Sequence, residues 1–231
     1  KQGGAHWQGD KRPHRLEVDN LGLHLARWRS GWTVTVPQNN LRTDGEPWPK
    51  GHFALAWQPA QGDAPGPESE EELRVRATGL NLQRLEPLIP LFSRLSPQML
   101  ENWRTLHPQG EIDALALDVP LRQPDQTRFQ ARWRDMSWQH WQLLPGAQHV
   151  MGTLNGSLAD GRLDIRVNDA VMPYGTMFRA PLEIAQASGT LSWQHSKNAL
   201  ALQGRDLDIQ ARSLWARGDF SYRQATGQAP R

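Results

Sequence analysis

Residues 160–167 read Asp-Gly-Arg-Leu-Asp-Ile-Arg-Val, and the architecture of the whole chain follows from the pattern in this short run. Leu163, Ile165 and Val167 alternate with charged residues. Successive side chains of a β-strand point to opposite faces, so these three side chains share one face. Asp160-Gly161 is typical of a tight hairpin turn, because glycine readily adopts the positive φ that such turns need. The run therefore predicts a strand with one apolar and one charged face.

The same alternation recurs along the 231 residues. Its further occurrences are residues 16–19, 23–25, 32–36, 53–57, 73–76, 115–119, 129–134, 191–194 and 207–212. Strands that follow one another this closely are expected to pair as neighbours in an antiparallel meander. The outward charged residues, such as Arg74, Asp164 and Arg166, then form a solvated face with cross-strand pairs. The sequence predicts a mainly all-β fold.

Two regions depart from this alternation. Residues 59–72 are rich in Pro, Gly and acidic residues, which indicates a mobile surface loop. Residues 81–106 carry the helical signal, with Pro97 placed as the first residue of an amphipathic helix that ends before His107. We therefore expect an N-terminal sheet portion over residues 1–80, one or two short helices in a connection over 81–108, and a C-terminal sheet portion over 109–231.

A one-sided sheet must cover its apolar face. A second sheet or a closed barrel achieves this cover, and a half-pipe whose concave face holds a ligand is a third solution. Small residues such as Ala131, Gly152 and Gly156 are predicted to leave space on this face, which suits a groove for lipid acyl chains better than a packed core. We therefore expect a long curved meander that forms an open β-groove. The predicted lipid-binding residues are Leu117, Phe129, Trp133, Leu154, Ile165, Leu191, Trp193 and Ile209.

Composition argues against several other functions. The formal net charge is only +2 and no basic block is present, so nucleic-acid binding is not expected. The chain has no cysteine, and its 8 histidines lack metal-ligand spacing, so neither a metal nor a cofactor is expected. No motif for an enzyme is present, and no apolar run is long enough to span a bilayer. The chain begins without an initiator Met, which suggests a segment of a longer protein with any membrane anchor elsewhere.

The 11 tryptophans leave a second function open. Trp32, Trp57, Trp133 and Trp193 fall on the apolar phase of the alternation, where they line a core or groove. Trp28, Trp138, Trp141 and Trp215 fall off that phase or near a turn. Exposed indole rings of this kind can stack on sugars or pack at sheet edges. A non-catalytic module that binds glycan through these four residues, or protein through its sheet edges, is therefore the alternative.

A series of short phrases in residues 85–222 resembles the YhdP-type branch of the AsmA-like, TamB-related superfamily of bacterial envelope proteins. The phrases are Pro108-Gln-Gly110-Glu-Ile112, residues 129–138, Leu144-Pro145-Gly146, residues 152–156, residues 178–182, Gly189-Thr-Leu-Ser-Trp193 and Leu207-Asp-Ile209. The resemblance implies an internal segment of a periplasmic protein that is tethered to the inner membrane through another region. It also implies phospholipid transport between the inner and outer membranes, with phospholipid acyl chains, neighbouring segments of the same chain and other envelope proteins as partners. No catalytic residue carries over.

Overall fold

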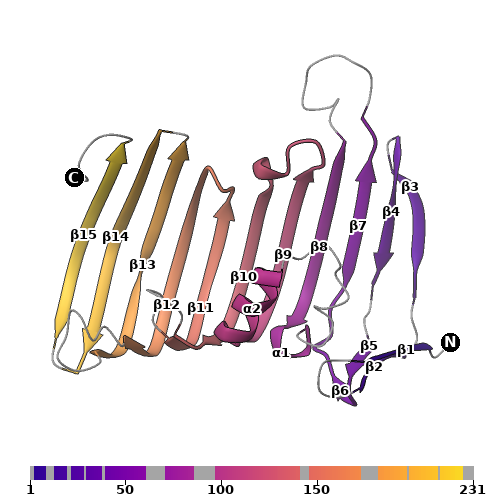
Figure 1. Ribbon diagram of the computed structural model, residues 1–231, viewed down its shortest axis with the longest axis horizontal. Helices are drawn as coiled ribbons and strands as arrows, with labels where there is room; N and C mark the ends of the chain where they lie inside the picture. Colours follow the sequence, from indigo (N-terminus) through magenta and orange to yellow (C-terminus); the bar gives the residue numbers. More distant parts are fainter. Residues whose placement is uncertain are drawn as a thin grey trace. The chain divides into compact units, whose positions relative to one another are not determined.

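The computed structural model describes residues 3–8, 13–19, 22–28, 30–37, 40–60, 71–85, 97–140, 146–172, 182–196, 198–212 and 214–225. These residues form two compact units. The first comprises residues 1–101 and 111–127, and the second comprises residues 102–110 and 128–231. Helix α2 (Pro97–Leu106) is divided between them. Each unit is described by itself below (Figure 1).

The first unit contains two antiparallel sheets. Five strands pair in the order β9-β8-β7-β4-β3, and four shorter strands pair in the order β1-β2-β5-β6. The five-stranded sheet consists of β3 (His24–Trp28), β4 (Gly31–Val36), β7 (Phe53–Gln58), β8 (Glu72–Asn81) and β9 (Gln109–Pro120). The smaller sheet consists of β1 (Gly3–Gln8), β2 (Pro13–Asp19), β5 (Asn40–Thr43) and β6 (Glu46–Pro47). The sequence pattern alone did not separate these two sheets.

The second unit is built on six long strands that pair in sequence order. These strands are β10 (Arg128–Trp138), β11 (Gly146–Gly156), β12 (Asp160–Met172), β13 (Leu182–Ser196), β14 (Ala199–Ala211) and β15 (Trp215–Ala225). Each strand is antiparallel to its neighbour, as a meander requires. Because β10 and β15 lie at opposite ends of this order, the sheet of this unit does not close on itself. The predicted antiparallel, mainly β architecture is confirmed.

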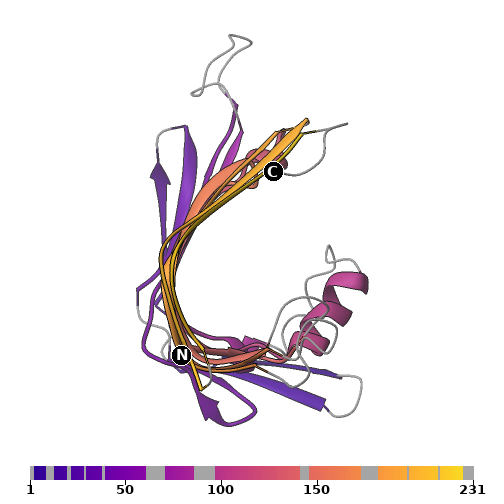
Figure 2. The ribbon, with the colours of Figure 1, turned by 90° about the vertical axis from the view of Figure 1, so that its left-hand side faces the viewer.

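Bulges bend the strands of the second unit. The β10–β11, β13–β14 and β14–β15 ladders each contain a register shift. Asp135, His149, Asp169 and Asp206 have φ between 51° and 59°, which is the left-handed region that Asp and His tolerate better than most residues. A bulge bends its strand and increases the local twist. Figure 2 shows the result, because β12 to β15 follow an arc with a concave and a convex side.

The two predicted interruptions are partly described. Helix α2 begins at Pro97 and ends at Leu106, as the spacing predicts, and α1 is confined to Leu82–Leu85. Residues 86–96 lie outside the described residues. Most of the acidic loop predicted for residues 59–72 also lies outside them, and Glu72 already belongs to β8. A further short 3-10 helix covers Pro124–Gln126.

Candidate apolar groove

The second unit carries an apolar face that runs across all six of its strands. Residues that pair across antiparallel strands point to the same face, so the register groups this face into rows. The first row is Phe129, Gly156, Gly161, Trp193, Leu202 and Tyr222, and the second is Ala131, Leu154, Leu163, Leu191, Gly204 and Phe220. Trp133, Gly152, Ile165 and Gly189 form the third, and Val167, Ala187, Ile209 and Ala216 form the fourth. None of these positions carries a charge.

The predicted groove residues of the second unit all lie on this apolar face. Phe129 and Trp193 share the first row, where their rings stack with centroids 6.5 Å apart. Leu154 and Leu191 share the second row, and the remaining predicted residues occupy the third and fourth. Leu117 is the exception, because it belongs to the first unit.

Several residues of the apolar face are absent from the predicted set, and Leu202 and Phe220 are the large ones most exposed among them. Leu202 and Phe220 have 37% and 44% of their surface exposed, more than any predicted residue on this face. The alternation that predicts apolar-face residues is present around both positions. Leu200 and Leu202 alternate with polar or small residues, and so do Phe220 and Tyr222. They lie on β14 and β15, the last two strands of the meander, and form the most accessible part of the face.

The apolar face is not equally accessible along its length. Val150 has no exposed surface, and it forms a buried cluster with Ala147, Ala170 and Ile184. Ile165 and Ile209 pack against this cluster. The rows that contain Phe129 and Ala131 are farther from the cluster along the strands. An apolar ligand therefore has easier access to the first two rows than to the fourth.

Four glycines of the apolar face do not leave the open space that the sequence analysis predicted for Gly152. A Cβ atom added at Gly152 would lie 2.7 Å from the Trp133 ring, and one added at Gly161 would lie 2.2 Å from the Trp193 ring. The glycines of the next two strands are covered in the same way, Gly189 by Leu207 and Gly204 by Phe220. Large side chains thus lie across the glycines of neighbouring strands. This arrangement fills the space above these four glycines and makes this part of the apolar face smoother.

The opposite, polar face of the second unit carries the charged side chains. Arg162 donates to the Asp164 carboxylate, with a shortest distance of 2.7 Å, and Thr190 donates to the same carboxylate at 2.5 Å. The hydrogen bond from Arg162, followed by that from Thr190, holds the pKa of Asp164 below its usual value. On β14 and β15, Asp208 accepts from Arg217 and from Trp215, and its pKa is lowered for the same reason. These pairs confirm the predicted solvated face.

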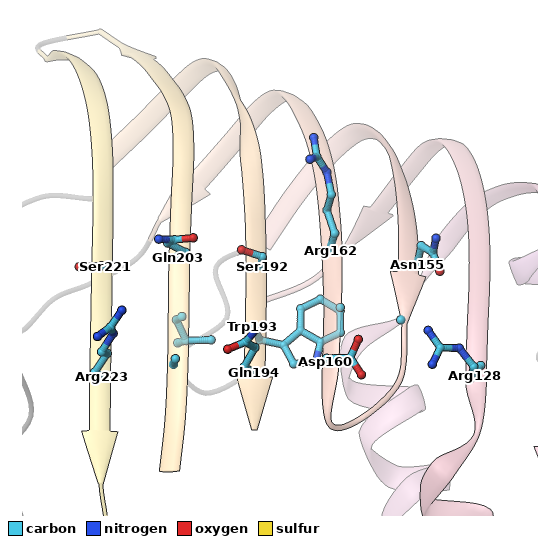
Figure 3. Close-up of a pocket in the computed structure, with 14 residues that line it drawn as sticks. Arg128, Asn155, Asp160, Arg162, Ser192, Trp193, Gln194, Gln203, Ser221 and Arg223 are labelled. Atoms are coloured by element: carbon cyan, nitrogen blue, oxygen red, sulfur yellow. The ribbon is translucent and has the colours of Figure 1, made fainter. Parts of the chain in front are cut away.

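One pocket of the second unit is lined by residues of both the polar and the apolar rows. Its volume is about 360 Å³, and Figure 3 shows Arg162, Ser192, Gln203 and Arg223 among the residues that line it. Trp193 and Leu202 of the first apolar row line it as well. The polar and apolar faces are opposite sides of the same strands, so one of them lies on the concave side of the arc in Figure 2.

The five-stranded sheet of the first unit has its own apolar row. Leu25, Val34, Leu55, Val75 and Leu117 are cross-strand partners from β3 to β9. In the next row, Trp32 and Trp57 contact each other with centroids 6.1 Å apart, and the Trp57 indole donates to Glu71 at 2.9 Å. Arg76 pairs with Asp118 at 2.6 Å on the opposite face. Leu117 thus lies on an apolar face, as predicted, in a separate unit.

The four tryptophans predicted as a sugar platform do not form one group. Trp138 packs against the buried apolar cluster, which removes it from the predicted set. Trp215 lies on the polar face and is 63% exposed. Trp141 and the side chain of Trp28 lie outside the described residues. Of the four, Trp215 is therefore the one that the described structure leaves as an exposed platform.

Neither a metal-binding cluster nor a membrane-spanning helix is found among the described residues. Within the ranges given above, no group of three or more His, Asp or Glu side chains is arranged to hold a metal ion. In the same ranges, none of the helices has the length and apolar character needed to cross a membrane.

Comparison with known proteins gives one family and one curated relative. The family model described as YhdP protein matches residues 1–231. The intermembrane phospholipid transporter YhdP of Escherichia coli (strain K12) is 47% identical over 232 residues, which cover 100% of this chain. The chain spans only 18% of the length of that relative. No solved structure matches the chain.

Proposed function

The chain belongs to the YhdP family, and on this premise we propose that it is a segment of a lipid-transfer protein that shields phospholipid acyl chains from water. One observation carries the proposal: the uncharged rows that cross the six strands of the second unit. We place these rows on the concave side of its arc, where an acyl chain would be enclosed. The relative's transport of phospholipid between membranes supplies the cargo class. The lining residues that we propose include the predicted set together with Leu202 and Phe220.

The physical basis is transfer of hydrocarbon from water to an apolar surface. Burial of one methylene stabilises by about 0.8 kcal/mol, so an acyl chain laid along these rows gains on the order of 10 kcal/mol before ordering costs. Rings such as that of Trp193, which lies across Gly161, fill the depressions that the glycines would otherwise leave along the face. A smooth wall holds many chain positions with similar energy, which lets a lipid slide. Such a wall also discriminates poorly between acyl chains.

We further propose that the segment works in the periplasm, tethered to the inner membrane through a part of the protein outside this chain. The family and the relative's intermembrane role support an envelope location. Neighbouring segments of the same long protein are the first partners to expect, because the chain spans 18% of its relative. No catalysis is involved, since movement along a face breaks no covalent bond.

Site-specific photo-crosslinking in the full-length protein tests the lipid contact. A photoreactive residue at Phe220 or Ile165 points to the apolar face and should capture phospholipid. The controls are the adjacent positions Ser221 and Arg166, which point to the polar face. Phe220 should crosslink more strongly than Ile165, because Ile165 packs against the buried cluster. Equal capture from adjacent positions would refute the proposal.

A charge placed on the apolar face provides a second test. Leu154→Asp puts a carboxylate in the second row, and Asn155→Asp puts the same carboxylate on the opposite face of the same strand. Leu154→Asp should reduce the phospholipid that co-purifies with the full-length protein, and Asn155→Asp should not. Far-ultraviolet circular dichroism checks that both variants keep their β-structure. Unchanged lipid content in a folded Leu154→Asp variant would contradict the proposed path.

A further inference from the structure

The exposed Trp215 lies on the polar face, opposite the apolar rows, and has no role in a lipid groove. Its indole N–H donates to Asp208 at 3.1 Å, and the Arg217 guanidinium carbon lies 5.4 Å from its ring centroid. Arg217 also bonds to Asp208, so the three side chains hold one another. Trp215 is 63% exposed although these contacts hold its indole ring. A fixed, exposed aromatic ring is prepared for stacking because little side-chain entropy remains to be lost.

A line of carboxamides leads away from this ring. Trp215 pairs with Gln210, Gln210 with Gln186, and Gln186 with Asn168, so these four side chains form one row across β15, β14, β13 and β12. Among the described residues, the Asn168 and Gln186 carboxamides have no hydrogen-bond partner. Neighbouring strands lie about 4.8 Å apart. The row thus offers one neutral polar group per strand, beside an aromatic ring.

The carboxamides face a shallow depression of about 390 Å³. Its lining includes Asn168, Gln186 and Gln210 together with Arg166, Ser188 and Asp208. Two of the charges near it, Asp208 and Arg217, neutralise each other. Arg166 is the remaining charged residue of the lining, and Met151, Val167 and Ala187 supply its apolar part. The other lining groups are neutral and polar, so the site suits a ligand with many hydroxyl or amide groups.

We propose that Trp215 and this carboxamide row form a binding site for a glycan chain, independent of the lipid groove. Sugar hydroxyls both donate and accept hydrogen bonds, and carboxamides do the same. The apolar face of a sugar ring stacks on an indole. The strand spacing is close to the length of one sugar residue, so an extended glycan placed along the row meets one polar side chain per residue. The site lies on the opposite face of the strands from the apolar rows.

Calorimetric titration of the full-length protein in detergent tests the site. The probes are a β-1,4-linked N-acetylglucosamine hexamer and a β-1,4-linked glucose hexamer, which separate amide from hydroxyl recognition. The native protein should bind at least one of them with a dissociation constant of about 1 mM or tighter. Trp215→Ala and Gln186→Ala should each weaken that binding, the former by about tenfold.

The matched control is Gln130→Ala, which removes an exposed carboxamide from the same face on β10, far along the sheet from Trp215. This variant should bind as the native protein does. Absence of binding of both hexamers to the native protein would overturn the proposal. So would native affinity in Trp215→Ala, or an equal loss in Gln130→Ala. Phospholipid co-purification should stay unchanged in Trp215→Ala, so failure of the glycan site is distinguishable from failure of the lipid groove.

Discussion

The contact between Trp193 and Gly161 gives the sharpest test of the apolar face. In Gly161→Ala the new Cβ atom would lie 2.2 Å from Cζ2 and 2.3 Å from Cη2 of the Trp193 ring. Carbon atoms in contact are at least about 3.5 Å apart, so the ring must move by about 1.3 Å. That movement disturbs the 3.1 Å hydrogen bond from the Trp193 indole to the Ser157 carbonyl. It also disturbs the stacking of Trp193 on Phe129.

These contacts determine how much stability Gly161→Ala is expected to lose. Forcing an extra methyl group into a packed site costs about 1–3 kcal/mol. The weakened indole hydrogen bond adds about 1 kcal/mol. Replacing glycine by alanine restricts the unfolded chain, which returns about 0.4–1 kcal/mol. The net expectation is that Gly161→Ala lowers the local stability of β12 and β13 by about 1–3.5 kcal/mol, with a central value near 2 kcal/mol.

Hydrogen exchange followed by mass spectrometry measures this local stability in the full-length protein. A loss of about 2 kcal/mol should speed the exchange of protected β12 and β13 amides by about 30-fold. The matched control is Gly218→Ala on β15, another glycine of the apolar face, where a Cβ atom would meet nothing within 4 Å. Exchange in that variant should stay close to native or become slower.

Equal exchange rates in the two alanine variants would refute the reasoning. That result would mean that the Trp193 ring does not lie across Gly161. The smooth apolar wall inferred from the other covered glycines would then lose its best-defined example.

Three further predictions concern burial, backbone strain and pH. Val150→Ala removes two methyl carbons from a fully buried side chain of the second unit. We expect chemical denaturation to show a decrease of about 2 kcal/mol in the free energy of unfolding. A decrease below about 0.5 kcal/mol would show that Val150 is not enclosed. Gly79 has φ of 65°, and a Cβ atom added there would lie 2.7 Å from a backbone oxygen. Gly45 has φ of 87°, but an added Cβ atom would meet nothing within 4 Å. Gly79→Ala should therefore lower the melting temperature more than Gly45→Ala does, and the reverse order would contradict the close contact at Gly79. The lowered pKa of Asp164, bonded to Arg162, stabilises the fold above the ordinary value of 3.8, and this contribution is lost as the pH falls through the lower folded value. Asp164→Asn should therefore lose less stability than the native protein between neutral pH and about pH 3 in urea titrations, and an identical pH dependence would show that the pair is not formed.

The limits of the sequence analysis are clearest at Trp138. Phe129, Ala131 and Trp133 establish a period of two that places Trp138 on the polar face. The register shift after Trp133, next to the left-handed Asp135, inserts one residue into the strand. The phase then changes, and Trp138 packs against the buried apolar cluster. No local pattern announces such a bulge, because it depends on how the neighbouring strand pairs.

What the sequence determined is which side chains share a face and which strands are neighbours. Both depend on short-range rules, because side-chain alternation is a property of the single strand and short connections force adjacent strands to pair. The tertiary structure alone decided the direction of curvature, the placing of β1, β2, β5 and β6 in a second sheet, and the covering of Gly152 and Gly161 by indole rings. These features depend on contacts between strands, and a cross-strand contact joins residues whose separation along the chain leaves no periodic signal. For that reason the sequence predicts an apolar face, and the fold determines how the strands curve and how the glycines of that face are covered.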